Sequence, residues 1–222
     1  MDAAIHLFAR RGFDGVSINE IGKEAGVTSQ LIYHYFRNGK QGLYREAYLR
    51  SFRHVMEASI RHLPPDPDPA DPAARIQAIE GLAIFIRNIV TAGGNALDSK
   101  ENEMLLLGYR ETFDPPEDLE PEIMDLLEIS ASRLRALLVV LLPKVTRLSI
   151  SLLGSAITGA LYHERMITGI LIQRRKGLNL SMEERAKFYI SYTLRVLGVD
   201  QELAPDHPYC KANLDKNVFY LC

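Results

Sequence analysis

The stretch SINEIGKEAGVTSQLIYHYFRNGK, residues 17–40, decides the fold of the first part of this 222-residue chain. Ser17 has a hydroxyl that can accept a hydrogen bond from a free N–H of a first helical turn. Glu20 follows at the spacing of a capping box. Gly22 in mid-helix suggests that another backbone packs closely there, and Gly26 stands where a helix ends, because glycine adopts the left-handed conformation without steric cost. The pattern predicts a short helix between Ser17 and Gly26.

A second short helix, 29–35, is predicted directly after this one. Val27 is expected to fill the turn, and Thr28 is placed to cap the helix. Leu31, Ile32 and Tyr35 supply its apolar spacing, and Tyr35 and Phe36 are expected to pack inside the N-terminal domain. Two short helices joined by a glycine-containing turn form a helix-turn-helix, whose second helix fits the major groove of B-DNA. An ordinary helical hairpin in a bundle is the alternative. The polar side chains of the second helix are Ser29, Gln30, Tyr33 and His34.

A longer pattern around these helices resembles the DNA-binding domain of the TetR family, the tetracycline-repressor-like bacterial transcription regulators. It covers about 45 residues, roughly the first quarter of the chain, and the likeness beyond it is architectural only. The resemblance implies an all-α protein in which a DNA-binding head is followed by a helical ligand-binding and dimerisation body. The matching residues are Phe8, Arg11-Gly12-Phe13, Val16-Ser17-Ile18, Ile21-Gly22, Ala25-Gly26-Val27-Thr28, Ile32-Tyr33-His34-Tyr35-Phe36, Lys40 and Leu43.

The DNA contacts follow from the chemistry of the side chains. Gln30 can form paired hydrogen bonds with adenine, and Ser29 can bond to either kind of base. Tyr33 and His34 lie on the same predicted face. Ser17, Thr28 and Lys40 are better suited to phosphates, which position a protein without specifying the sequence.

Charge is distributed unevenly along the chain, although the formal net charge is only −2. The segment from Met1 to Arg53 holds eight Lys and Arg residues against five Asp and Glu. The remainder holds 18 basic residues against 23 acidic ones. A basic head on an acidic body agrees with a protein whose first part approaches nucleic acid.

The rest of the chain reads as a series of helices. A long helix, 40–63, is expected to connect the DNA-binding domain, 1–46, with the helical body, 47–198, and the proline-rich stretch 64–72 ends it. Further helices are predicted over 73–92, from a capping box at Asp98, from 119 or 122 to 142, over 146–176, and from a capping box at Ser181. The tail 199–222 is either disordered or docks through its Val218–Leu221 segment; the pattern does not decide.

The last two long helices are expected to form a dimer. The resemblance implies that they pair with their counterparts across a two-fold axis, and small residues such as Gly154 and Gly159 let helices approach closely. Packing of the same faces within one chain is the alternative. A two-fold dimer is also what a palindromic operator requires.

The resemblance further implies an effector, a small molecule bound in a mostly apolar cavity of the body. The candidates are large or polar side chains on apolar helices. They are Phe85, Met104, Tyr109, Tyr162, His163 and Met166.

The sequence contains no catalytic constellation and no cofactor-binding or metal-binding pattern. It also has no membrane-spanning segment, and its two cysteines lie in the tail, so a soluble cytoplasmic protein is expected. The function predicted is a ligand-responsive transcription regulator, a repressor by the family default, and not an enzyme. A helical small-molecule-binding protein or enzyme with a vestigial head, or a nucleoid-type DNA binder without a ligand, is the alternative. No sequence pattern indicates which effector binds, which operator is recognised, or whether transcription is repressed or activated.

Overall fold

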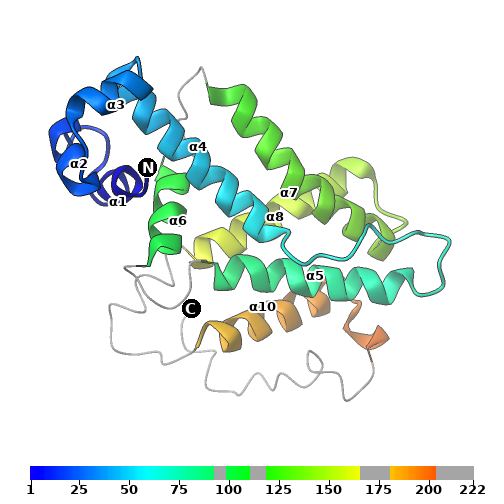
Figure 1. Cartoon of the computed structure of the whole chain (residues 1–222). Helices are drawn as coiled ribbons and strands as arrows, with labels where there is room; N and C mark the ends of the chain where they lie inside the picture. The colour runs from blue at the N-terminus through cyan, green and yellow to red at the C-terminus, as the bar shows by residue number, and fades with distance from the viewer. Residues whose placement is uncertain (93–98, 111–118, 166–180, 204–222) are drawn as a thin grey trace. The chain divides into compact units, whose positions relative to one another are not determined.

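A computed structural model describes residues 1–92, 99–110, 119–165 and 181–203 (Figure 1). Every regular element in these ranges is a helix, and no strand occurs among them. None of the described helices has the length and hydropathy that crossing a membrane requires. The elements in chain order are α1 (Asp2–Arg11), α2 (Ile18–Ala25), α3 (Ser29–Tyr35), α4 (Gly39–Ser59), α5 (Ala74–Thr91), α6 (Lys100–Arg110), α7 (Glu120–Leu141), α8 (Arg147–His163), α10 (Met182–Leu197) and the 3₁₀ helix η3 (Asp200–Glu202).

The chain divides into two compact units, each assembled from two stretches of sequence. The first comprises Met1–Ala58 and Ala92–Ser130, and the second comprises Ser59–Thr91 and Ala131–Cys222. Helix α6 and the first half of α7 therefore belong to the same unit as the N-terminal helices. The sequence-based division after residue 46 follows the order of the chain, and it stays a prediction.

The core of the first unit receives side chains from α1, α2, α3, α4 and α6. Phe8 of α1 meets Tyr44 of α4 edge-to-face, with ring centroids 4.9 Å apart, and Phe13 approaches the same ring at 5.1 Å. Such edge-to-face pairs add to the free energy of burial. These aromatic rings fix α1 and the loop after it against the start of α4.

A buried carboxylate joins α6 to α1. Glu103 of α6 accepts a hydrogen bond from Arg10 Nε at 3.2 Å, and its Oε1 lies 2.6 Å from Nδ1 of His6. Its side chain is nearly inaccessible to solvent, so these two partners compensate the cost of burying its charge. Through this contact α6 holds the helix on which the helix-turn-helix packs.

The second unit has its own core, formed by α5, α7, α8 and α10. Helix α5 is apolar on more than one side and buries ten of its 18 residues. At the end of α7, Arg75 of α5 donates hydrogen bonds of 3.0 and 3.1 Å to the carbonyl oxygens of Val140 and Leu141. These carbonyls have no partner within their own helix, so the arginine caps α7.

A buried ion pair connects the end of α8 with α10 in this unit. Glu164 Oε1 accepts a hydrogen bond from Arg185 Nε at 2.6 Å, and its Oε2 accepts one from the Tyr189 hydroxyl at 2.9 Å. Both charged residues are buried. Burial, together with the neighbouring carboxylate, raises the pKa of Tyr189 well above its ordinary value. The tyrosine therefore stays protonated and keeps donating to Glu164.

Most predicted helix boundaries are confirmed, and two differ. The helix expected over 40–63 ends at Ser59, and His62 has a positive φ of 60°. The residue before a proline avoids the helical conformation, and Pro64 follows. Helix α6 is capped by Ser99, whose hydroxyl accepts from the Asn102 N–H at 3.2 Å. The expected cap Asp98, the helix beyond residue 165 and the tail beyond 203 lie outside the described residues.

Candidate DNA-binding surface

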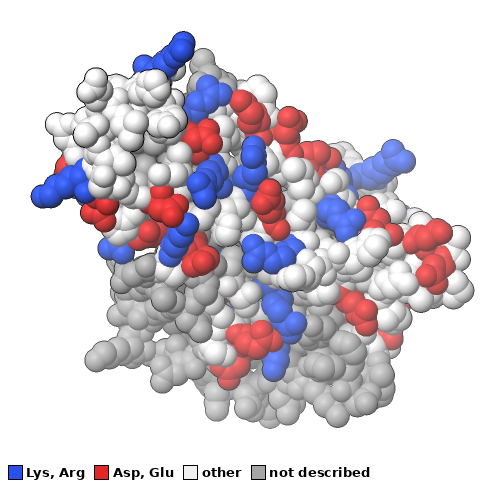
Figure 2. Space-filling model, in the orientation of Figure 1, with Lys and Arg blue, Asp and Glu red and all other residues white. Residues whose placement is uncertain are grey.

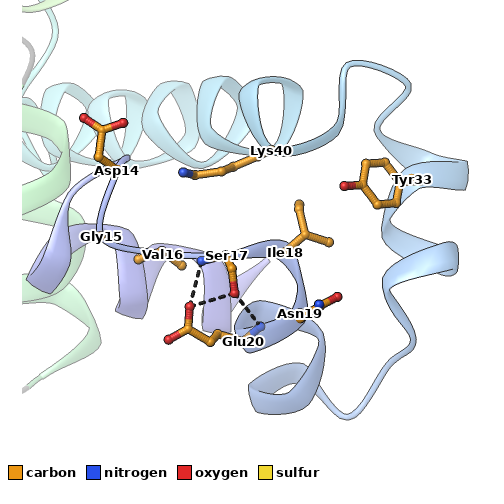
Figure 3. Close-up of a pocket in the computed structure, with 9 residues that line it drawn as sticks. All are labelled: Asp14, Gly15, Val16, Ser17, Ile18, Asn19, Glu20, Tyr33 and Lys40. Carbon is orange, nitrogen blue, oxygen red and sulfur yellow. Dashed lines mark hydrogen bonds between the residues drawn. The ribbon is translucent and has the colours of Figure 1, made fainter.

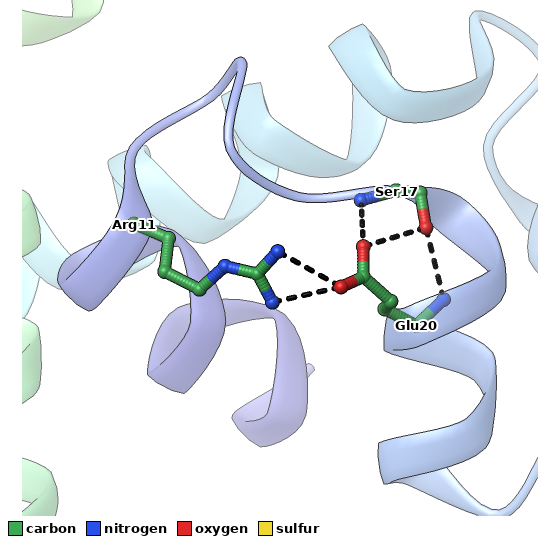
Figure 4. Close-up of polar contacts among 3 residues, drawn as sticks. All are labelled: Arg11, Ser17 and Glu20. Carbon is green, nitrogen blue, oxygen red and sulfur yellow. Dashed lines mark hydrogen bonds and ion pairs between the residues drawn. The ribbon is translucent and has the colours of Figure 1, made fainter.

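The predicted capping box forms at the start of α2 (Figure 4). The Ser17 hydroxyl accepts from the Glu20 N–H at 3.2 Å, and Glu20 Oε2 accepts from the Ser17 N–H at 2.8 Å. Arg11, at the end of α1, donates two hydrogen bonds of 2.8 Å to the other carboxylate oxygen. The Ser17 hydroxyl, followed by the other hydrogen bonds, lowers the pKa of Glu20 to about 2. Glu20 is therefore an anion at the helix start throughout the physiological range.

The hydroxyl of Ser17, which was predicted to contact a phosphate, is occupied by the capping box. Its hydroxyl also donates to Glu20 Oε2 at 2.7 Å, so both of its hydrogen-bonding roles serve the capping box. The residue is exposed and stands at the edge of the candidate surface. Its contact with a phosphate stays a prediction, and Arg11 is the residue that partly neutralises the carboxylate beside it.

Two glycines shape the turn between α2 and α3. Gly26 adopts the left-handed conformation, with φ 68° and ψ 29°. The Val27 N–H donates to the Gly22 carbonyl at 2.9 Å. A Cβ atom on Gly22 would lie 2.8 Å from the Val27 carbonyl oxygen, so only glycine allows this close approach. The close backbone contact that the sequence suggested at Gly22 is confirmed.

Helix α3 is held at its start by two side chains. Thr28 caps it by accepting from the Leu31 N–H at 3.3 Å, as predicted. The Ser29 hydroxyl donates to Asn19 Oδ1 of α2 at 2.6 Å, so Ser29 links the two helices. Ile32 is the one residue of α3 that is buried. Gln30, Tyr33 and His34, the other predicted reading residues, are exposed on this helix.

The apolar side chains of α3 were expected to turn inward, and for two of them this is wrong. Leu31 is 42% exposed and Tyr35 is 72% exposed. Leu31 lies about 100° around the helix from Ile32 and so turns away from the core. Tyr35 is on the same side as Ile32, but it is the last residue of this short helix and stays exposed. Phe36 is half-buried against the core, as expected. Val27 is also partly outside the turn it was expected to fill, with 38% of its surface exposed.

A shallow groove of about 520 Å³ lies beside α3, and Figure 3 shows the side chains of Tyr33 and Lys40 entering it. The Lys40 ammonium lies 4.2 Å from the centre of the Phe13 ring, a cation–π contact that fixes its direction. Gly39 has a φ of 59°, and a Cβ atom there would lie 2.8 Å from Tyr33 Cε1. The groove is lined by Asp14, Gly15, Val16, Ser17, Ile18, Asn19, Glu20, Tyr33 and Lys40.

The charged residues that line this groove are Asp14, Glu20 and Lys40. The chain carries no acidic residue from Ala25 to Arg45, a segment that contains Arg37 and Lys40 as well. Figure 2 shows a largely uncharged patch on the N-terminal helices, with both basic and acidic side chains at its edge. The acids of the groove, Asp14 and Glu20, come from the segment before α3. Helix α3 can thus approach a polyanion without like-charge repulsion from its own residues.

Sequence reasoning missed the residues that support this surface. Phe13 was expected to fold back on the first helix and matched the family pattern, but the contact by which its ring orients Lys40 was not predicted. Gly39 was not singled out, although a glycine between two predicted helices is a signal for a positive φ. Arg11 forms an ion pair with Glu20, nine residues further along the chain and on the next helix, and no local pattern indicates this pair.

The six predicted ligand-binding residues are divided between the two units. Met104 and Tyr109 belong to the first unit. The second unit contains Phe85, Tyr162 and His163. Phe85 is buried in the core, Tyr162 is half-buried and His163 is exposed. Met166 lies outside the described residues. Their assembly into one binding site stays a prediction.

Known proteins with the same features are bacterial regulators. Residues 1–47 match the family model described as "Bacterial regulatory proteins, tetR family". A segment of 62 residues, 28% of this chain, is 27% identical to IcaR of Staphylococcus epidermidis, a helix-turn-helix negative transcriptional regulator of the biofilm operon icaADBC. That match spans a third of the length of IcaR.

The fold extends the likeness along the chain. The TetR family transcriptional regulator PfmR of Thermus thermophilus superposes with a TM-score of 0.60 at 18% identity, over 87% of this chain and 96% of PfmR. A putative transcriptional regulator of Pseudomonas aeruginosa gives a TM-score of 0.65, also at 18% identity, over 90% of this chain and 89% of that one. The chain has a TetR-like all-helical fold, and its residues 1–47 are similar to the DNA-binding domain of the tetR family.

Proposed function

We propose that this protein is a transcription regulator that binds an inverted-repeat DNA operator as a homodimer and leaves it when a small molecule binds. The observation that carries the proposal is α3, which keeps one residue in the core and exposes Gln30, Tyr33 and His34. A helix with this outer face, held by a glycine turn against a capped helix, fits the major groove. The family match over residues 1–47 supports the same reading.

The exposed polar residues divide into reading and positioning groups. Gln30 offers both an amide donor and an amide acceptor, the pair that matches adenine in the major groove. Lys40 and Tyr33 enter the groove beside α3 and are suited to the phosphate backbone. Thr28 caps α3, and Ser29 is bonded to Asn19. In the complex these two hold the recognition helix while their oxygens remain able to accept a hydrogen bond.

The dimer is supported by the outer face of α8. Ile150, Gly154 and Leu161 of this helix are buried, whereas Leu148 is 71% and Leu152 is 63% exposed. The exposed leucines lie four residues apart and therefore on one side of the helix. A Cβ atom on Gly159, seven residues beyond Leu152, would have no atom of the described residues within 4 Å. Large apolar side chains followed by a small residue fit a helix from a second copy of the chain.

The dimer has a direct test in solution. Leu152→Arg is expected to shift the molar mass measured by light scattering from a dimer to a monomer. Ile76→Arg is the matched control, because Ile76 is also an exposed apolar residue of the second unit but lies on α5. If the two variants have equal molar masses, the proposal that α8 forms the dimer interface is refuted.

The effector, the cytoplasmic location and the absence of enzymatic activity are proposed from the similarity to the tetR family. A ligand weakens DNA binding only through its different affinity for the DNA-bound and released shapes of the dimer. Titration of small molecules against a labelled operator measures this difference. If no ligand changes the affinity for the operator, the proposed effector is refuted, whereas the proposed DNA binding is unaffected.

The DNA-binding part is tested by two variants at several salt concentrations. Lys40→Ala is expected to weaken all duplexes and to lower the slope of log affinity against log salt by about 0.9 for each lost phosphate contact. Gln30→Ala is expected to keep the slope and to lose about 1–3 kcal/mol of discrimination at one base pair of each half-site. If both variants change slope and specificity alike, the division into reading and positioning residues is wrong.

A further inference from the structure

Apolar side chains gather on the outer face of the recognition helix. Between Met1 and Ala58, the exposed large hydrophobic residues all lie in the nine positions from Val27 to Tyr35. Two of them, Val27 and Leu31, are purely aliphatic and stand four positions apart. Single exposed leucines on a protein surface need no explanation, but a concentration confined to the helix proposed to read DNA does.

The surroundings of Leu31 define what it can touch. It follows Gln30 on the N-terminal half of α3, the part of a recognition helix that reaches base edges. Its backbone N–H is already bonded to Thr28, so the side chain alone is offered to a partner. No acidic residue occurs from Ala25 to Arg45, so nothing in this segment repels DNA.

The edge of a base pair in the major groove contains one apolar group, the C5-methyl of thymine. The other groups there are hydrogen-bond donors or acceptors, which an aliphatic side chain would leave desolvated without a partner, or the small C–H groups of cytosine C5 and purine C8, which offer less apolar surface than a methyl group. A leucine at this position therefore gains free energy against thymine and loses it against the other bases.

We propose that Leu31, with exposed Val27 in the turn before its helix, reads the C5-methyl group of a thymine, so that each half-site of the operator requires a thymine at the position Leu31 faces. This inference rests on the proposed binding of duplex DNA and adds to it the identity of a base. Gln30 and Leu31 are adjacent in sequence. In the same half-site, the Gln30 amide would hydrogen-bond to one base and Leu31 would contact the methyl group of a thymine.

The experiment removes the methyl group and nothing else. A duplex selected by the full-length protein is resynthesised with each thymine replaced in turn by deoxyuridine, which keeps every hydrogen-bonding group. Burying one methyl-sized group corresponds to about a fourfold change in affinity. The wild-type protein is expected to bind about fourfold more weakly when dU replaces dT at one position of a half-site, and about 15-fold more weakly when both half-sites are changed.

Variants assign the effect to its residue. Leu31→Ala is expected to bind dT and dU duplexes equally at that position, and Val27→Ala is expected to reduce the ratio in part. Gln30→Ala is the matched control on the same helix: it binds more weakly but keeps the fourfold ratio between dT and dU.

The outcomes separate this inference from the function on which it rests. If the wild-type protein binds its selected duplex and no dU replacement changes the affinity, the thymine contact is refuted and the regulator stands. The same holds if Leu31→Ala keeps the dT over dU ratio. If the folded protein selects no duplex at all, the proposed function fails and the thymine contact fails with it.

Discussion

Gly39→Ala tests how the candidate surface is held together. Gly39 has a φ of 59°, and the Cβ atom that alanine adds would lie 2.8 Å from Cε1 of Tyr33. Two costs follow: alanine must adopt the left-handed conformation, and the tyrosine ring must move from its place at the groove. The variant is therefore expected to be less stable and to bind all duplexes more weakly.

The two costs have different sizes and origins. The left-handed backbone costs about 1–2 kcal/mol for a residue with a Cβ atom. A ring pushed off its preferred rotamer adds about 0.5–1.5 kcal/mol. The first cost is independent of residue 33, whereas the second exists only while the tyrosine is present.

A double-mutant cycle separates these contributions. The free energy of unfolding in urea is measured for the wild type, Gly39→Ala, Tyr33→Ala and the double variant. The coupling between the two substitutions is expected to be about 0.5–1.5 kcal/mol, because removing the ring relieves the clash. Gly42→Ala is the control: Gly42 lies inside α4 without a positive φ, alanine favours a helix by about 1 kcal/mol, and the added Cβ would meet only the Asn38 side chain closely, at 3.3 Å.

Two results would refute this reasoning. A Gly39→Ala variant as stable as Gly42→Ala would mean that the left-handed turn carries no cost. A coupling of zero would mean that Gly39 does not position Tyr33, and Tyr33 would then lose its proposed support at the groove.

Two further predictions concern the charges of the two units. The pKa of Glu20 in the folded protein, about 2, lies below its ordinary value of 4.5, so the stabilisation from this carboxylate is complete above pH 4.5 and is lost as the pH falls toward 2. Glu20→Gln should flatten the decline of the urea midpoint across this window, and an unchanged decline would contradict the capping box. Glu164→Ala leaves Arg185 buried without its carboxylate and should cost about 3–5 kcal/mol of unfolding free energy. Glu183→Ala, which breaks an exposed pair with Arg87, should cost less than about 1 kcal/mol, and equal losses would show that burial of Glu164 is unimportant.

Local patterns in the sequence predicted what local interactions decide. The caps at Ser17, Thr28 and Ser181 are bonds within four residues of the chain, and all three are confirmed. Gly26 and Gly198 end their helices in the left-handed conformation because no other residue does so as easily. These signals and the apolar spacing predicted the individual helices, whereas the all-α fold class was implied by the resemblance to the TetR family.

Contacts between distant residues were not predictable in the same way. Glu103 bonds to His6 across 97 residues, and no spacing in the sequence connects them. The exposure of Leu31 and Tyr35 was mistaken because apolar spacing on a helix of seven residues does not show how many of them reach a core. Of the predicted DNA-contact residues, Gln30, Tyr33 and His34 are exposed on α3, which agrees with that use, and their contact with DNA stays a prediction.

Selection of bound sequences from a random pool of duplexes, with purified full-length protein at fixed near-physiological salt, tests the central claim most directly. The account predicts an inverted repeat in which each half-site contains a thymine that Leu31 reads and a base that Gln30 reads. The selection is repeated in the presence of small molecules. If the folded protein selects no preferred sequence under either condition, the assignment of α3 as a recognition helix is contradicted.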